Sequence, residues 1–178
     1  MATHVALLRG INVGGNNLIK MADLKACFED GGFADVTTFI QSGNVLFTAR
    51  GSGPALTERI ERMLSSAFGY EASVVLRTRS QMRAVVDRAP AGFGTDPSAH
   101  RYDVIFLKPP LSAKTAMRVV SLREGVDEAF AGTGVIYFSR LASRLTQSRV
   151  NKIVGTPEYR SMTIRNWNTT TKIAALMG

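Results

Sequence analysis

Residues 7–17 read LLRGINVGGNN, and this stretch carries the strongest structural signal in the 178-residue chain. Four successive apolar residues, Val5 to Leu8, predict a β-strand that is buried on both faces. The strand pattern ends at Arg9, and a loop rich in Gly and Asn leads to a helical pattern that begins near Met21. Backbone amides in such a loop can bind an anion. The sequence therefore predicts a strand, a candidate anion-binding loop and a helix in succession.

Outward from this stretch, strand and helix patterns continue through the first half of the chain. The expected elements are a strand at 3–9, a helix at 21–30, strands at 36–41 and 44–48, a helix after Pro54, and a strand at 73–77. Ser42-Gly43 between the two middle strands is a hairpin signal. The resulting order, βαββαβ, is that of a ferredoxin-like unit.

The second half repeats this order after a short helix from Ser80 to Arg88, which Ser80 is expected to cap. The expected elements are a strand at 102–107, a helix at 112–121, strands at 126–130 and 135–139, a short helix at 148–154, a strand at 161–165 and a helix at 167–176. The sequence thus predicts an α+β fold of two ferredoxin-like units in tandem, at 1–88 and 102–178, with a C-terminal helix. Residues 89–101 are the expected connector.

Composition indicates a folded protein that does not enter a membrane. Apolar residues make up 45% of the chain, which is enough for a packed core. The apolar runs are strand-sized, far short of the roughly 20 residues that a membrane helix needs. The N-terminus lacks the pattern of a secretory signal, and a single cysteine, Cys27, suits a reducing compartment. We therefore expect a cytoplasmic protein, with Cys27 in its core.

The net charge of +8 is unevenly distributed. Residues 1–90 carry ten Lys and Arg against eight Asp and Glu, whereas residues 91–178 carry twelve against six. A basic surface on the second half is therefore expected. Such a surface could attract a polyanion, or it could simply keep the protein soluble.

Three segments resemble a known family. They are Leu7-Leu8-Arg9-Gly10-Ile11-Asn12-Val13-Gly14-Gly15 with Met21 and Leu24, then Phe39-Ile40-Gln41-Ser42-Gly43-Asn44, and Thr163-Ile164-Arg165-Asn166-Trp167-Asn168-Thr169. They are similar to the signature segments of the bacterial domain of unknown function 1697 family, where Lys is common at the position of Asn16 and Tyr at that of Phe39. The resemblance implies a tandem ferredoxin-like fold in a cytosolic bacterial protein. It implies no assigned activity.

The candidate site follows from the pairing of the first and third strands, which are antiparallel neighbours in a ferredoxin-like unit. The end of the first strand should then lie beside the start of the third. This arrangement would gather a guanidinium, side-chain amides, a hydroxyl and glycine amides, from Arg9, Asn12, Gly14, Gly15, Gln41, Ser42 and Asn44. Arg can bind a phosphate or carboxylate through two hydrogen bonds. The alternative is structural: the glycines make a tight connection, and Asn44 satisfies its own backbone.

A second candidate segment runs from Thr163 to Lys172. Arg165, Asn166, Trp167 and Asn168 could together stack a base and hold phosphates. The competing interpretation is a helix start, in which Asn166 or Asn168 caps the helix and Trp167 packs as an anchor. We favour the structural interpretation for Trp167, while for Arg165 both stay open, and we add Arg165 to the candidate ligand-binding residues.

No complete catalytic set is recognisable. His4, Cys27 and His100 have no metal-ligand spacing, and neither Ser42 nor Ser139 lies in a nucleophile elbow. We therefore expect no metal and no cofactor, and whether the protein is an enzyme stays open. The predicted function is the binding of a small anionic, phosphate-bearing ligand at the loop after the first strand. The alternative is a nucleic-acid-binding module that uses the basic C-terminal half.

Overall fold

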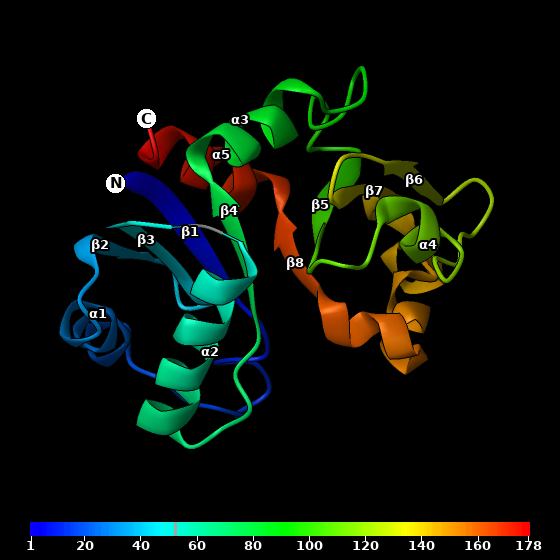
Figure 1. Ribbon diagram of the computed structural model, residues 1–178. Coiled ribbons are helices and arrows are strands. Elements are labelled where there is room, and N and C mark those ends of the chain that lie inside the picture. Colours follow the sequence, from blue (N-terminus) through cyan, green and yellow to red (C-terminus); the bar gives the residue numbers. More distant parts are fainter. Residues whose placement is uncertain (52) are drawn as a thin grey trace. The chain divides into compact units, whose positions relative to one another are not determined.

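The computed structural model describes residues 1–51 and 53–178, which form a mixed α/β protein with two antiparallel four-stranded sheets (Figure 1). The chain divides into two compact units. The first contains Met1–Met82 together with Ile173–Gly178, and the second contains Arg83–Lys172. No helix within the described residues is long and apolar enough to cross a membrane.

The first unit contains the strands and helices that its sequence predicts. They are β1 (Ala2–Leu8), α1 (Met21–Asp30), β2 (Ala34–Phe39), β3 (Asn44–Ala49), α2 (Pro54–Phe68) and β4 (Val74–Thr78). The sheet order is β2-β3-β1-β4, so β1 lies between β3 and β4. Figure 1 shows α1 and α2 beside one another on one side of this sheet. The pairing of β1 with β3 brings Leu7 opposite Asn44, at the edge where the candidate site was expected.

The core of the first unit explains the continuous apolar run of β1. Ala6 and Leu8 pack in one cluster with Phe28 of α1 and Leu64 of α2. Val5, on the opposite face of the strand, is also completely buried. The prediction that β1 is covered on both faces is therefore confirmed. Cys27 packs against the same cluster but is only partly buried, because it lies at the edge of the apolar stripe of α1.

The second unit contains a sheet of order β6-β7-β5-β8. Its strands and the helix that follows them are β5 (His100–Leu107), β6 (Asp127–Ala131), β7 (Val135–Leu141), β8 (Met162–Asn166) and α5 (Trp167–Leu176). The last four residues of α5 and the first four of α3 (Arg79–Asp87) belong to the first unit. The strands match the prediction closely, whereas the helical segments differ.

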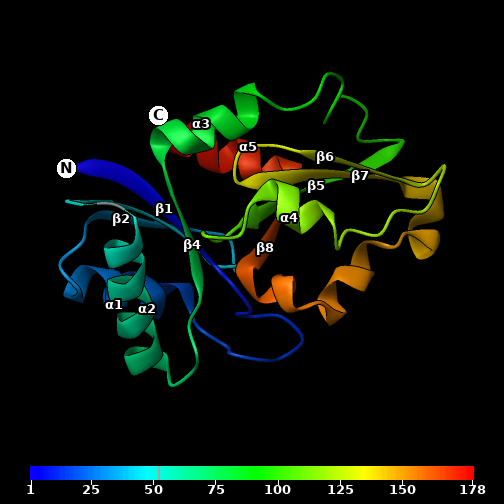
Figure 2. The same ribbon diagram turned by 45° about the vertical axis from the view of Figure 1, so that its right-hand side comes forward.

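Two helical predictions in the second unit were wrong, the first in the length of the helix and the second in its type. The helix expected at 112–121 is only α4 (Ala113–Met117), capped by Ser112, and it tightens into i to i+3 hydrogen bonds before Val119 and Val120. The helix expected at 148–154 is part of a series of 3-10 turns, at Ala142–Gln147, Val150–Gly155 and Pro157–Ser161, which carry the chain from β7 to β8 (Figure 2). Pro157 has no amide hydrogen to donate and Gly155 favours turns, so a continuous α-helix cannot form here.

The cap of α3 also differs from the prediction. The Gln81 amide donates to Thr78 Oγ1 at 3.2 Å, and the Thr78 amide donates to Gln81 Oε1 at 2.9 Å. This reciprocal pair is a capping box, and its cap residue lies two residues before Ser80. The Ser80 hydroxyl lies 3.0 Å from Thr78 Oγ1 instead. Thr78, the last residue of β4, therefore begins the helix.

Candidate functional site

The loop after β1 is built from residues that adopt the left-handed backbone conformation. Gly10, Gly14 and Gly15 have φ values of 68°, 60° and 77°, and Asn12 and Asn17 have values of 54° and 46°. Glycine adopts this conformation without strain, and asparagine tolerates it better than most residues. The Gly and Asn content that marks the sequence therefore sets the path of this loop.

Asn12 holds the loop in place through its side-chain amide. Asn12 Nδ2 donates to the carbonyl oxygens of Ile19 and Gln41, both at 2.9 Å, and Asn12 Oδ1 accepts from the Ile19 amide at 2.8 Å. Asn17 Nδ2 closes the loop from the other side by donating to the Gly10 carbonyl at 2.9 Å. The structure thus brings Asn12 and Gln41 together, and it uses the Asn12 amide as an internal brace.

The turn between β2 and β3 fits closely against the same region. Gly43 has a φ of 85°, and a Cβ atom there would lie 2.6 Å from the side chain of Ile11. Asn44 is completely buried, and its Nδ2 donates to the Phe39 carbonyl at 2.8 Å and to Ser42 Oγ at 3.2 Å. Asn44 therefore stabilises the turn, as the structural interpretation predicted. Phe39, at the end of β2, is half-buried.

Four of the candidate residues lie where a ligand could reach them. Gly14 and Gly15 are exposed at the tip of the loop, and nothing lies within 4 Å of a Cβ built on either. Arg9 is half-buried at the base of the loop, where its amide donates to the Ser73 carbonyl at 3.0 Å. Gln41 is exposed beside them. The accessible chemistry of the loop is therefore its glycine amides, the Arg9 side chain and the Gln41 side chain.

Arg165 belongs to the second unit and is almost completely buried. Its Nη1 donates to Thr163 Oγ1 and to the Ile164 carbonyl, both at 2.9 Å. Burial lowers the pKa of Arg165 to about 10. Arg77, at the same position of β4 as Arg165 is of β8, is also buried, and its pKa is likewise lowered to about 10. Arg77 was not among the candidate residues. The signal that could have identified it is the repeat, because β4 and β8 are the last strands of the two halves and each has Arg as its fourth residue.

Two other predictions for the second unit can be compared with the structure. Asn166 Oδ1 accepts from the Thr169 amide at 2.7 Å, so Asn166 caps α5 as the structural interpretation expected. His100 was expected in the connector at 89–101, but it begins β5 and is half-buried, because the strand starts two residues earlier than predicted.

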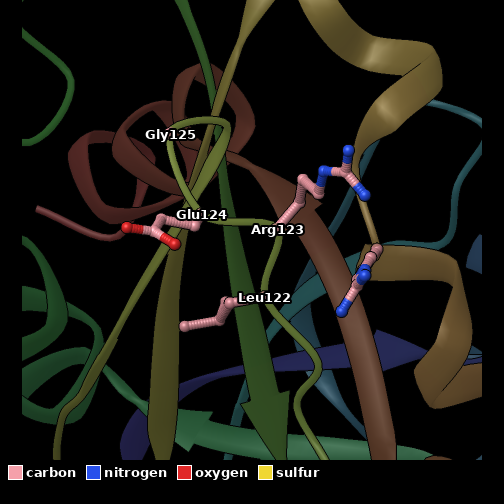
Figure 3. Close-up of a pocket in the computed structure, with 5 residues that line it drawn as sticks. Leu122, Arg123, Glu124 and Gly125 are labelled. Atoms are coloured by element: carbon pink, nitrogen blue, oxygen red, sulfur yellow. The ribbon is translucent and has the colours of Figure 1, made fainter.

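The sequence analysis missed a cavity of about 580 Å³ in the second unit, lined by Leu122, Arg123, Glu124, Gly125 and Arg149 (Figure 3). Asp127 Oδ2 accepts from the amides of Arg123 and Arg149, at 2.9 and 2.8 Å, and so holds these two residues together. In Figure 3 the side chains of Arg123 and Glu124 point in opposite directions. Within the described residues, the guanidinium groups of Arg123 and Arg149 have no hydrogen-bond or ion-pair partner.

Among residues 1–51 and 53–178, no cluster of three or more His, Cys, Asp or Glu side chains could hold a metal ion.

The chain is a mixed α/β protein with two antiparallel sheets and a Gly/Asn loop that is braced by hydrogen bonds. It belongs to the family described as protein of unknown function (DUF1697), whose model matches residues 1–137.

One solved structure is similar over nearly the whole chain. It is that of conserved bacterial protein SP0830 from Streptococcus pneumoniae, which is 27% identical in sequence, with a TM-score of 0.85. The alignment covers 99% of each of the two chains. A search of curated proteins gives no match.

Proposed function

We propose that this protein binds a small anionic, phosphate-bearing ligand at the loop after β1. The observation that carries the proposal is the open tip of the loop, where Gly14 and Gly15 are exposed and nothing lies within 4 Å of a Cβ built on either. Backbone amides favour anions, and Arg9 at the base of the loop would add a charged donor. The Asn12 brace fixes the loop before a ligand arrives, which reduces the entropy lost on binding.

The proposed site consists of Arg9, Asn12, Gly14, Gly15, Gln41, Ser42 and Asn44. Arg165, in the second unit, is a separate candidate ligand-binding residue. Their proposed roles differ. Asn12 and Asn44 would shape the site through the hydrogen bonds described above, whereas Gly14, Gly15, Arg9 and Gln41 would contact the anion. Ser42 is half-buried and would act through Asn44.

The test is calorimetric titration of the protein with inorganic phosphate, pyrophosphate and AMP. Replacing Arg9 with Ala should weaken binding by roughly 10- to 150-fold, the range for losing hydrogen bonds to a charged group. The matched control is Arg123→Ala, which removes an arginine from the cavity of the second unit. If Arg123→Ala weakens binding and Arg9→Ala does not, the anion binds in that cavity and the proposal is wrong.

The nucleic-acid alternative makes a different prediction about salt. Binding of a polyanion weakens steeply as salt rises, with a log-log slope of roughly −0.9 for each phosphate contacted on duplex DNA. Binding of one small anion should depend on salt far less. A steep slope for an unrelated oligonucleotide, together with no binding of the small anions, would favour the basic second half as the binding surface.

We also propose that the two sheets are tandem ferredoxin-like repeats in a cytoplasmic protein, with units at 1–88 and 102–178 joined by residues 89–101. The strand orders β2-β3-β1-β4 and β6-β7-β5-β8 support the repeat, because both have the first strand of the unit between its third and its last. Superposing the two halves of an experimental structure tests it, since a true repeat aligns all four strands in the same order and direction.

A further inference from the structure

The segment Asn166-Trp167-Asn168 lines a second cavity, which the proposed anion site does not use. This cavity has a volume of about 240 Å³ and lies within the second unit. Its walls are mostly rings and amides, contributed by His100, Arg101, Tyr102, Asn166, Trp167 and Asn168. Residues from the start of β5 and from the junction of β8 and α5 therefore meet around one small space.

The indole of Trp167 is held in a fixed position on one side of this cavity. Phe93 is buried beneath it, with ring centroids 5.2 Å apart and planes at 88°. Gly94 lies against the edge of the indole, since a Cβ atom on Gly94 would be 2.1 Å from Trp167 Nε1. Phe93 also contacts Tyr102 edge-on, at 4.9 Å and 65°. The aromatic rings are therefore positioned before any ligand binds, which is what a stacking platform requires.

The polar groups of the cavity indicate which ring would bind there. Asn166 uses Oδ1 to cap α5, and no interaction of its Nδ2 is found in the described part of the chain. Asn168 is exposed, and its side-chain amide can both donate and accept. Donors and acceptors of this kind match the edge of a nucleobase, and asparagine is a common partner of adenine.

The charge of the cavity points to an anionic substituent on that ring. No carboxylate lines the cavity, and Arg101 is its one fully charged group. The Arg101 side chain is anchored by Nη1, which donates to the Pro97 carbonyl at 3.0 Å. A guanidinium held in this way still has other donors for a phosphate.

We propose that this cavity binds the purine base of a nucleotide. Trp167 and Tyr102 provide the aromatic walls, Asn166 and Asn168 bind the edge of the base, and Arg101 binds its phosphate. The same chemistry fits the base of a free nucleotide and a base in single-stranded RNA. This site is in the second unit and does not depend on the loop after β1.

Trp167 is the single tryptophan of the chain, so tryptophan fluorescence comes from a residue that lines this cavity. Titration with AMP should change the fluorescence in a saturable manner. Replacing Asn168 with Ala should raise the dissociation constant about tenfold, as expected for losing hydrogen bonds to a base. Arg101→Ala should weaken AMP binding and leave adenosine binding unchanged. The matched control is Arg144→Ala, an exposed arginine of the same unit outside the cavity.

Trp167→Phe, followed by calorimetry, provides a variant that keeps an aromatic ring and therefore the packing on Phe93. It should weaken binding of AMP and of adenosine alike, because both stack on the same platform. Arg9→Ala should leave the Trp167 response to AMP unchanged, so this proposal and the anion-binding loop can fail separately.

A comparison of AMP with a short oligoadenylate distinguishes the two sources of the base. Equal affinity for both would assign the cavity to a free nucleotide, and much tighter, salt-sensitive binding of the oligonucleotide would assign it to RNA. The proposal is overturned if adenosine, AMP and the oligonucleotide produce neither a fluorescence change nor heat. It is also overturned if Asn168→Ala and Trp167→Phe both bind AMP as tightly as the unmodified protein.

Discussion

Two tyrosines have buried hydroxyls in opposite situations. Tyr137 Oη donates to the Val85 carbonyl at 2.6 Å, whereas Tyr70 Oη is buried and has no hydrogen-bond partner within the described residues. Tyr137→Phe should lower the free energy of unfolding by about 1–3 kcal/mol, because it leaves the Val85 carbonyl unpaired. Tyr70→Phe should leave stability unchanged or raise it. Urea denaturation of both variants measures the difference, and an equal loss in the two would contradict this account.

Tyr70 also predicts a loss of stability at alkaline pH. Burial, with the nearby Cys27 and Glu61, raises the pKa of its hydroxyl from 10.0 to about 12. The unfolded chain therefore releases this proton at a lower pH than the folded protein does, so stability falls as pH rises between these two values. The same denaturation series in Tyr70→Phe should show a smaller fall over that range.

Cys27 tests the environment of α1. Burial, and to a lesser degree the charge of Asp30, raises the pKa of its thiol above 9.0. Since the thiolate is the reactive form, a thiol-specific reagent should modify Cys27 more slowly at neutral pH than it modifies free cysteine. Asp30→Asn should lower the pKa and speed the reaction, while Asp23→Asn in the first turn of α1 should not. Reaction as fast as that of free cysteine would mean that the side chain is not shielded.

At the scale of secondary structure, the sequence predicts an element well where its pattern is long and its ends are marked. The bounds of α1 are those predicted, because Gly31-Gly32 ends a clear apolar stripe. The segment from 142 to 161 was predicted poorly. Its apolar residues, among them Val150 and Ile153, have helical spacing, but 3-10 turns place them in the core equally well. Local patterns do not distinguish these two solutions.

The capping box of α3 gives a prediction at the same scale. Thr78→Ala should lower the free energy of unfolding by about 0.5–2 kcal/mol, because the Gln81 amide loses its acceptor. Ser80→Ala should cost less, since the Ser80 hydroxyl contacts only the exposed Thr78 hydroxyl among the described residues. Thermal unfolding of the two variants compares these losses of stability. A larger loss in Ser80→Ala would mean that Ser80 caps α3, as the sequence predicts.

At the scale of the whole molecule, the sequence predicts which loops meet but not which hydrogen bonds their side chains form. The antiparallel pairing of β1 with β3 is enough to bring Asn12 to Gln41. That the Asn12 amide bonds to the Ile19 backbone depends on the conformation of the loop, which residue spacing does not reveal. The sequence also gives no sign that Arg123 and Arg149 lie close together, because what joins them is the Asp127 carboxylate, which accepts hydrogen bonds from both backbone amides.

The division of the chain into units leads to a prediction about its C-terminus. Residues Ile173–Gly178 belong to the first unit, although about ninety residues of the second unit separate them from Met82. Ile173 and Met177 are buried, at 0% and 4% exposed. A chain ending at Lys172 should therefore lose at least about 2 kcal/mol of stability, the lower limit for truncating one such side chain.

Hydrogen exchange can locate this loss. Amides of β1 and β4 should exchange faster in the shortened chain, because the missing residues belong to the same compact unit and two of them are buried. A chain ending at Met177 retains both buried side chains and lacks only exposed Gly178, so its exchange should match that of the full chain. Faster exchange confined to β5–β8, with β1 and β4 unchanged, would mean that the last residues stabilise the second unit. The second unit would then include the last residues of the chain, as the sequence predicts.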